Sequence, residues 1–418
     1  MRTALKRAIL NGKIVAQNIK ALDLSYFAKG AFWLGSSYVI IALIRLAQSS
    51  ILARGSSVEF FGQFQFVLSI IATLTLAALP GMETAITQAV ANKKTASLIL
   101  GTKAKLKSSL IGSISLLALG AFFTFIKPQP FAQALIVAAP LFPIYTSFNS
   151  IQGYYRGTGN FKMASFCETL FYSVNAIALI SAFLITHSLT IMLLSMMIAG
   201  ATIMMALYLN VARNIRSEES DPSTVSLGKS LTLMSAIQFT TPHIDRYIIT
   251  AFLGFEALAI YTIAISISLY LTYGGKLLST LVLPKLARIQ AHHETRIKHL
   301  LFAYAFSIAA TLALIALVLP YAIPLLFSDQ YTSSIPLAQL SLTALAFSLP
   351  SMILITYFQT RKNLALLYKF QFAKGAFNFV LLILLVSWLG IMGAVISKII
   401  LELCGFIFLS RRFYAIKI

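Results

Sequence analysis

Among the ionisable residues inside the long apolar runs of this 418-residue chain, seven are the first candidates for chemistry. A charged side chain near the centre of a bilayer costs about 3 kcal/mol or more, so such residues face protein or a water-filled cavity. Arginine and lysine there suit the binding of an anionic group, and carboxylates suit the uptake of a proton or cation. The seven residues are Arg45, Glu83, Asp245, Arg246, Lys276, Lys398 and Glu402.

The composition identifies the elements that must position these side chains. The chain is 58% hydrophobic and only 11% charged, with a mean hydropathy of +0.84. A soluble domain is about 25% charged, so the sequence predicts a polytopic membrane protein. Its apolar runs are long and continuous, which favours helices over the alternating strands of about ten residues that build a β-barrel. Cys167 and Cys404 both lie in such runs and predict neither a disulfide framework nor a metal site.

Twelve membrane-spanning helices are predicted when about 20 apolar residues are assigned to each crossing. The second and eighth runs are longer than one crossing needs, which predicts either that these helices tilt or that they contain breaks near Pro80 and near Gly274-Gly275. The predicted spans are 30–52, 61–90, 108–126, 131–154, 164–186, 189–211, 230–253, 257–283, 300–327, 333–358, 365–388 and 391–410.

The positive charges test this count. The net charge is +21, and the Lys and Arg residues gather at the termini and in the loops after even-numbered helices. The loops after odd-numbered helices contain only Arg54 and Lys127. Positive charge concentrates in cytoplasmic loops, so both termini are expected in the cytoplasm. The charge is therefore explained by topology, and no nucleic-acid partner is expected.

The longest polar interval, 213–226, divides the helices into two sets of six. A weak internal similarity at an offset of 197 residues, in which Glu59 lines up with Glu256, agrees with a duplication. Duplicated helical bundles with a central site are typical of transporters. The expected domains are a cytoplasmic segment at 1–29, a six-helix lobe at 30–211, a cytoplasmic linker at 212–229, a second lobe at 230–410 and a cytoplasmic tail at 411–418.

Four segments in order along the chain resemble a known family. They are ILARGSSVEFFGQFQFVLSI with LPGMETAITQAVANKK within 51–94, QGYYRG at 152–157, DRY at 245–247 with a glycine at 254, and LPKLA at 283–287. Together they are similar to bacterial polysaccharide-biosynthesis flippases. These are the O-antigen (Wzx-type) translocases of the multidrug/oligosaccharidyl-lipid/polysaccharide (MOP) exporter superfamily. The motifs are loose, so they indicate a family and leave the sugar open.

The resemblance implies two six-helix lobes in a V, with the first, second, seventh and eighth helices lining a central cleft. It also implies a multi-pass transporter of the bacterial inner membrane, not an enzyme. Such a transporter moves undecaprenyl-diphosphate-linked oligosaccharide from the cytoplasmic to the periplasmic leaflet by alternating access. Such a flippase works in lipopolysaccharide biosynthesis, beside a polysaccharide polymerase and a chain-length regulator. A cation-coupled multidrug exporter of the same superfamily is the alternative.

Within this resemblance, Arg45, Arg246 and Lys276 are expected to bind the diphosphate of the substrate. Arginine offers a planar fork of donors that suits phosphate oxygens. Each of the three also has a structural alternative. Arg45 could bond neighbouring carbonyls or an acid, Arg246 could bond between helices, and Lys276 could extend to the membrane surface.

Glu83 and Asp245 are the candidates for coupling transport to a proton or Na⁺, because a desolvated carboxylate has a raised pKa. The structural alternative for Glu83 is a partner for Arg45, for Arg246 or for a backbone amide freed by Pro80. No ATP-binding or hydrolytic motif is present, and neither a cofactor nor a resident metal is expected.

Lys398 and Glu402 are four residues apart on the predicted last helix. This spacing places them on one face, and the sequence predicts that they pair with each other for structure. Lys374, on the preceding helix, is expected either to contribute to a cationic lining or to extend to the membrane surface.

Overall fold

The computed structural model describes residues 24–215, 219–288, 294–360 and 364–414, which form helices joined by short turns. Eleven helical stretches are long and apolar enough to cross a membrane, so the protein is a multi-pass membrane protein. One stretch, Phe239–Thr272, contains two helices folded back on each other at Gly254, where φ is 86° and ψ is −174°. With these two separated, the described residues agree with the predicted twelve crossings.

The first lobe is built from α2 to α9. Its second helix continues into a short 3-10 turn, η1 (Thr75–Ala78), and its fifth into η2 (Phe148–Ser150). The helices are α2 (Leu24–Gly55), α3 (Val58–Leu74), α4 (Met82–Ala91), α5 (Ser97–Phe125), α6 (Ala132–Ser147), α7 (Ile151–Gly157), α8 (Phe161–Thr186) and α9 (Leu189–Asn214).

The second lobe is built from α10 to α14. The first of these helices is 66 residues long because it includes the fold-back at Gly254. A short 3-10 turn, η4 (Asp329–Tyr331), joins the next two. The helices are α10 (Ser223–Arg288), α11 (Glu294–Phe327), α12 (Ser334–Thr360), α13 (Leu364–Leu389) and α14 (Ile391–Tyr414).

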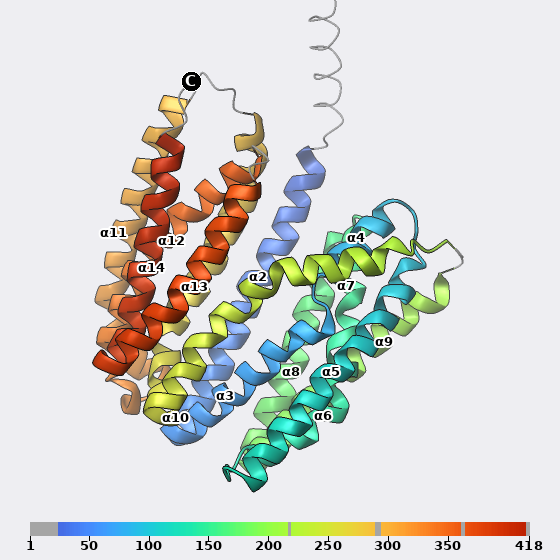
Figure 1. Ribbon diagram of the computed structural model, residues 1–418, viewed down its shortest axis with the longest axis horizontal. Coiled ribbons are helices and arrows are strands. Elements are labelled where there is room, and N and C mark those ends of the chain that lie inside the picture. Colours follow the sequence, from blue (N-terminus) through green and yellow to red (C-terminus); the bar gives the residue numbers. More distant parts are fainter. Residues whose placement is uncertain (1–23, 216–218, 289–293, 361–363, 415–418) are drawn as a thin grey trace, which may run out of the picture.

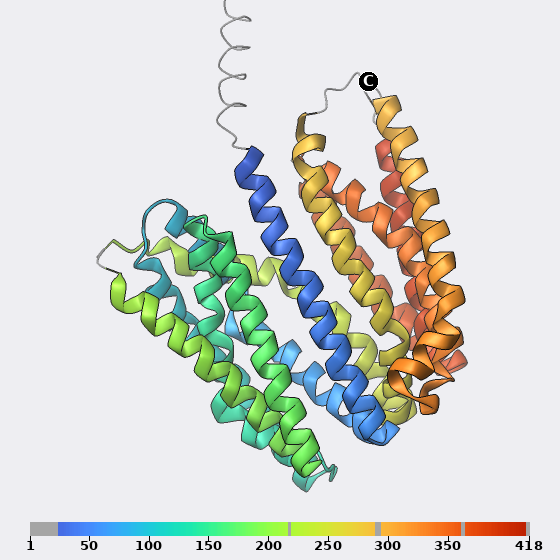
Figure 2. The same cartoon turned by 180° about the vertical axis from the view of Figure 1, so that it is seen from behind.

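The two lobes form a V, as the fold prediction requires. In Figure 1 the lobes meet near the bottom, where α3 and the fold-back of α10 pack together, and they diverge towards the top. The view from behind shows α2 between the two lobes, beside α8 (Figure 2). The starts of α2 and α5 and the end of α14 share the upper end, which we call the lysine-rich end.

The predicted break near Pro80 is present. The helix that begins at Val58 ends at Leu74, and after η1 the backbone turns through Leu79 at a φ of 54° before α4 starts at Met82. The break predicted at Gly274-Gly275 is wrong, because α10 continues through both residues. Gly275 serves close packing instead: a Cβ there would lie 2.3 Å from Leu349 of α12.

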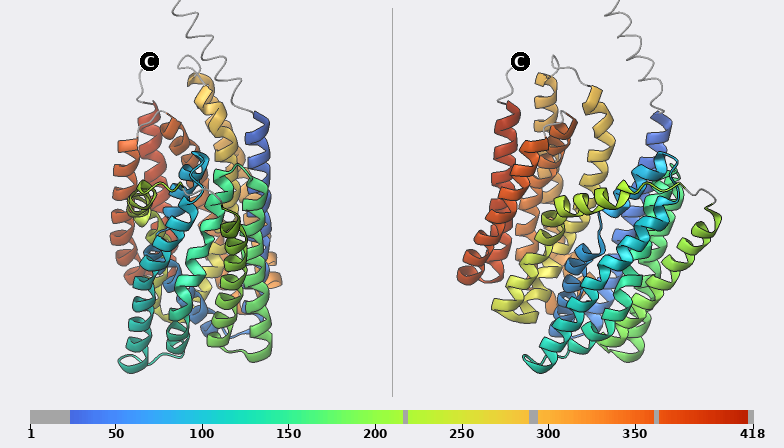
Figure 3. Two further views of the ribbon diagram at one scale, coloured as in Figure 1. Left: turned by 90° about the vertical axis from the view of Figure 1, so that its right-hand side faces the viewer. Right: turned by 45° about the vertical axis from the view of Figure 1, so that its right-hand side comes forward.

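The second lobe's first helix also starts earlier than predicted. It begins at Ser223, inside the segment expected to be linker, because Asp221 caps it: the carboxylate accepts hydrogen bonds from the Ser223 N–H at 3.0 Å and from the Ser223 hydroxyl. A Lys94–Asp221 ion pair at 3.1 Å attaches the cap to the first lobe. This first part of α10 crosses the long helices at a steep angle (Figure 3).

One face of α3 makes the main contact between the lobes. Gly62, Phe66, Ser69 and Thr73 recur at helical spacing, so they share a face that points to α10. Phe66 packs edge-on against Tyr247 and Phe255, with ring centroids 5.9 and 5.6 Å apart. Gly62 allows the closest approach, because a Cβ there would lie only 2.0 Å from the Phe255 carbonyl oxygen.

Candidate functional site

Arg246 lies at the junction of the two lobes. Its Nη1 donates to the Ser69 hydroxyl of α3 at 3.1 Å, so the guanidinium bonds between helices. The neighbouring Tyr247 hydroxyl donates to the Ser69 carbonyl at 2.8 Å and lies 2.7 Å from the Thr73 hydroxyl. Arg246 keeps further donors available, since its Nε is buried without a hydrogen-bond partner among the described residues.

Asp245, the adjacent residue, points into the second lobe and is 7% exposed. Its carboxylate accepts a 2.5 Å hydrogen bond from the Tyr261 hydroxyl, which follows the fold-back at Gly254. The Lys398 ammonium of α14 lies 4.0 Å from the same carboxylate oxygen. Asp245 therefore connects both arms of α10 with α14, while Arg246 faces the other lobe, as expected for neighbours on a helix.

Arg45 lies on α2 with an exposed side chain, and it contacts α8. Its guanidinium carbon stands 4.6 Å from the centre of the Tyr172 ring, a distance at which the ring attracts a cation. Stacking of this kind fixes the plane of the guanidinium against the ring of α8. Arg45 and Arg246 thus belong to different lobes and have different neighbours.

Glu83 lies in a charged cluster inside the first lobe. Its carboxylate is 3.5 Å from the Lys105 ammonium of α5 and 4.0 Å from Arg156 of α7. Arg156 also pairs with Glu168 of α8 at 3.7 Å and donates to Gln152 at 3.1 Å. The sequence offered Arg45 and Arg246 as structural partners of Glu83, whereas its ion pairs in the structure are with Lys105 and Arg156.

The predicted pairing of Lys398 with Glu402 is also wrong. Glu402 accepts two hydrogen bonds from the Lys374 ammonium of α13, at 2.8 and 2.9 Å, while Lys398 pairs with Asp245. Spacing along one helix shows that two side chains share a face, but it does not show which face a neighbouring helix covers. Lys374 therefore forms an interhelical ion pair.

Lys276, the third predicted cation, lies on α10, but its side chain is outside the part that the structure describes. Its predicted role stays a prediction. Among the described residues, no group of three His, Cys, Asp or Glu side chains lies close enough to hold a metal ion.

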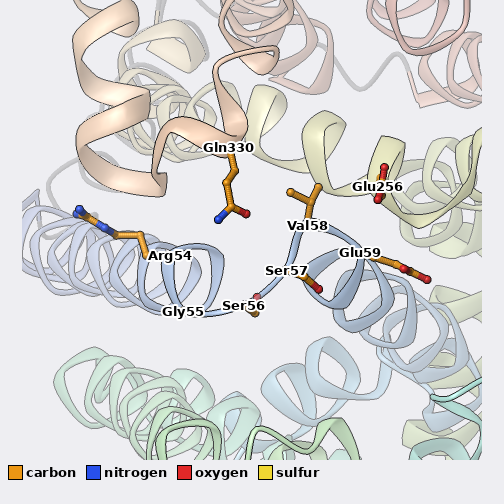
Figure 4. Close-up of a pocket in the computed structure, with 8 residues that line it drawn as sticks. All are labelled: Arg54, Gly55, Ser56, Ser57, Val58, Glu59, Glu256 and Gln330. Carbon is orange, nitrogen blue, oxygen red and sulfur yellow. The ribbon is translucent and has the colours of Figure 1, made fainter.

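A pocket of about 570 Å³ opens where the lobes meet, at the end of the molecule opposite the lysine-rich end (Figure 4). Glu59 from the first lobe and Glu256 from the second both line it, and these are the two residues that the internal similarity aligns. Arg54 lines it too and donates to the Leu325 carbonyl of α11 at 2.7 Å. The pocket marks the junction at which the two halves meet in related positions.

Four residues that the sequence analysis did not assign to the site take part in these networks. They are Ser69, Lys105, Arg156 and Tyr261. Lys105 was assigned to a loop, yet α5 begins at Ser97 and its ammonium is buried, with the side chain 3% exposed. The spacing of Gln152 and Arg156, four apart, was a usable signal for a shared face.

Solved structures with the same architecture identify the class of protein. A MOP superfamily transporter from Pyrococcus furiosus, whose binding pocket is described as having reversed polarity, aligns with a TM-score of 0.63 and 17% identity over 93% of this chain and 96% of its own. The lipid II flippase MurJ, in an inward closed conformation, aligns with a TM-score of 0.68 and 14% identity over 93% and 87%. The inward-facing form of a multidrug-resistance MATE family transporter aligns at 0.59 and 17% over 91% and 94%. The chain thus has the fold of MOP superfamily transporters.

The family follows from the sequence match. Residues 51–336 match the family described as polysaccharide biosynthesis protein, and the chain belongs to that family. A comparison with curated proteins gives no match.

Proposed function

We propose that the protein is a flippase that moves an undecaprenyl-diphosphate-linked oligosaccharide from the cytoplasmic to the periplasmic leaflet of the inner membrane. The observation that carries this proposal is the membership of the polysaccharide biosynthesis family. A flippase must accept a charged, sugar-bearing head between its lobes while the polyprenyl chain stays in lipid. The V-shaped arrangement of two helical lobes is compatible with this requirement.

The diphosphate is proposed to bind Arg45, Arg246 and Lys276. Support comes from the surroundings of the two arginines. Arg45 is exposed and stacked on Tyr172, and Arg246 has a buried Nε that no described residue accepts. Arg246 therefore keeps a donor for a phosphate oxygen, and Arg45 and Arg246 come from opposite lobes. A substrate bound by both would link the lobes and favour their closure around it.

Glu83 and Asp245 are proposed to couple transport to a proton or Na⁺. Each carboxylate is paired with a lysine, Glu83 with Lys105 and Asp245 with Lys398. Protonation of either carboxylate would remove the charge that holds its lysine, and the helices joined by that pair would then be free to move apart. Flipping that persists in vesicles after the proton and Na⁺ gradients are collapsed would contradict this coupling.

The topology of the proposal places both termini in the cytoplasm, with the lysine-rich end facing the same side. The proposed partners are membrane lipid, a polysaccharide polymerase and a chain-length regulator that use the flipped product. A reporter enzyme active only in the periplasm, fused after residue 418, should stay inactive. Activity of that fusion would reverse the proposed orientation.

The alternative function is a cation-coupled multidrug exporter, and the likeness of fold to a MATE transporter is what favours it. A site for cationic drugs is expected to carry acidic groups that lack basic partners. Here the two candidate carboxylates, Glu83 and Asp245, are both paired with bases. Drug resistance gained on expression in a sensitive strain, without any effect on surface glycan, would support the exporter instead.

The test of the flippase proposal is complementation of a strain that lacks its own copy of this gene. Arg45→Ala and Arg246→Ala should each abolish or strongly reduce surface glycan, because each removes a phosphate-binding fork. Arg246→Lys keeps the charge but loses the fork, so it should restore only part of the glycan.

Arg411→Ala is the matched control, since Arg411 is exposed at the end of α14, away from the junction of the lobes. It should restore the glycan fully. If Arg45→Ala and Arg246→Ala are expressed at the level of the wild type and also restore it fully, the proposed diphosphate contacts are wrong.

A further inference from the structure

A second hollow of the molecule lies outside the junction of the lobes, where the start of α5 meets the start of α10. Its volume is about 490 Å³, within the range of about 300–1,000 Å³ that ligand sites usually have. We call it the lysine groove. It is lined by Leu100, Lys103, Ala104, Lys107, Ser108, Val225 and Lys229.

The lysine groove has one continuous wall on α5. Its five α5 residues follow one another at intervals of one, three or four positions from Leu100 to Ser108, which places them on a single face of the helix. Val225 and Lys229 of α10 are also four apart and form the opposite wall. Each wall of the groove therefore carries lysine ammonium groups beside apolar side chains, which together form an apolar floor.

The three lysines of the groove carry charge that nothing nearby compensates. Lys103, Lys107 and Lys229 are all exposed, and within the described parts of the chain none of them forms an ion pair. Other lysines close by differ in this respect. Lys94 is paired with Asp221 at 3.1 Å, and Lys105, on the inner side of α5, is paired with Glu83.

The groove also lies near one end of a membrane-spanning stretch, where lipid headgroups are expected. The membrane-spanning stretch that contains its α5 wall runs from Ser97 to Phe125, so Lys103 and Lys107 lie within the first three turns of the span. Lysines near the end of a spanning helix extend their ammonium groups to the interface and leave their methylene stems in the apolar layer. Leu110 and Ile111, further along α5, are exposed, as expected for a surface that contacts acyl chains.

From this combination we infer that the lysine groove binds an anionic phospholipid of the leaflet on the lysine-rich side. The phosphate of the headgroup lies among Lys103, Lys107 and Lys229, and an acyl chain follows the exposed Leu110 and Ile111 along α5, towards the middle of the span. The uncompensated charge selects an anionic headgroup over a zwitterionic one. The exposed apolar surface at Leu110 and Ile111 selects a lipid over a soluble phosphate, which has no acyl chain to place there.

Such a lipid would also have a mechanical effect. One wall of the groove belongs to the first lobe and the other to α10, the helix that continues into the second lobe. The same stretch of α10 is held to α4, where the Thr232 hydroxyl accepts a hydrogen bond from the Gly81 N–H at 3.0 Å. A phospholipid across the groove reinforces this attachment, so the composition of the membrane would affect how firmly α10 is held.

The test is a native mass spectrometry titration of the purified full chain with phosphatidylglycerol, phosphatidylcholine and glycerol phosphate. Wild-type protein should bind one phosphatidylglycerol most tightly, phosphatidylcholine at least tenfold more weakly, and glycerol phosphate not measurably. A lysine near an anionic lipid surface strengthens binding by about fivefold, so the triple variant Lys103→Gln, Lys107→Gln, Lys229→Gln should lose about 100-fold. The three single variants should each lose about fivefold.

The matched control removes three other exposed positive charges, with Lys93→Gln, Lys369→Gln and Arg411→Gln in one protein. It should bind phosphatidylglycerol within twofold of the wild type. An equal loss in both triple variants would overturn the inference, because it would show attraction by overall charge alone. Equal binding of phosphatidylcholine would overturn the role of the charge, and competition by glycerol phosphate would overturn the role of the acyl chain.

A polyprenyl diphosphate that displaces phosphatidylglycerol with at least tenfold preference would assign the groove to the transported substrate and overturn the phospholipid assignment. The inference does not depend on the proposed flippase function. The groove variants alter lipid binding in the purified protein, and Arg45→Ala and Arg246→Ala alter surface glycan in cells, so either proposal can fail alone. If the triple variant does not fold, the single variants at these exposed positions provide the same comparison.

Discussion

Gly62→Ala should force the two lobes apart where they touch most closely. The added Cβ would lie 2.0 Å from the Phe255 carbonyl oxygen and 2.6 Å from its carbon, and an ordinary contact requires at least 3.4 Å. The obstacle is backbone, so no side-chain rotation relieves it, and α3 and α10 must separate by more than 1 Å. Overpacking of this kind costs about 1–3 kcal/mol, which exceeds the gain of about 0.5–1 kcal/mol from removing a helical glycine.

The assay is thermal unfolding of the purified protein, followed by intrinsic fluorescence, with Gly274→Ala as the matched control. Gly274 is exposed on α10, and a Cβ there meets nothing within 4 Å, so the same substitution should raise the unfolding temperature. Gly62→Ala should lower it. If both variants are stabilised to the same degree, the lobes do not meet at Gly62 in the protein as purified, and the packing argument is refuted.

Two further predictions concern ion pairs. A double-mutant cycle on Lys374 and Glu402, whose contacts are 2.8 and 2.9 Å, should give a coupling of about 1.5–3 kcal/mol, whereas Lys398 and Asp245, at 4.0 Å, should give less than about 1 kcal/mol. A reversed order of the two couplings in thermal unfolding would contradict the pairing described. Hydrogen bonds from Ser223 hold the pKa of Asp221 below its ordinary value of 3.8, so its contribution to stability is present above that pH and is lost as the pH falls further. Unfolding of the wild type and of Asp221→Asn should therefore differ near neutral pH and converge in acid, and a constant difference across this range would contradict the prediction.

The sequence predicted the crossings because the membrane imposes a simple rule on them. Each span needs about 20 apolar residues, and a proline followed by glycine interrupts a helix at a predictable place. The break at Pro80 followed from this reasoning. The same reasoning failed at Gly274-Gly275, because a glycine can also serve close packing, and the neighbour that requires it, Leu349, is distant in sequence.

The ends of helices were harder to predict than their centres. The start of α10 lies in a polar segment that resembles a linker, yet Asp221 followed by Pro222 is a recognisable start signal, an N-cap and then a proline in the first turn. The start of α5 was missed for a related reason. Lys103, Lys105 and Lys107 were counted as a loop, although two of them line a groove and the third is buried against Glu83.

The partners of the charged residues could not be predicted from one sequence. Spacing within a helix places Lys398 and Glu402 on one face, but their actual partners lie on α10 and α13. Which charged residues pair depends on how the helices are arranged around one another. That arrangement results from the packing of many side chains and cannot be read from the spacing within one helix. The candidates themselves were found because a charge inside an apolar run is conspicuous, as Arg45 and Arg246 are.

The first part of α10 has a consequence for how far the lobes can travel. The stretch of α10 that joins the lobes is a continuous helix and not a flexible loop. It is attached to the first lobe at two points, through Asp221 just before its start and through Thr232 further along. A movement of the second lobe would therefore bend α10 between Thr232 and the fold-back at Gly254, where Pro242 removes one backbone hydrogen bond, and would also break the contacts of Arg246 and Tyr247 with α3. The part of the chain that must bend lies within a helix. The bending stiffness of its roughly two dozen residues therefore limits how far the second lobe can move relative to the first.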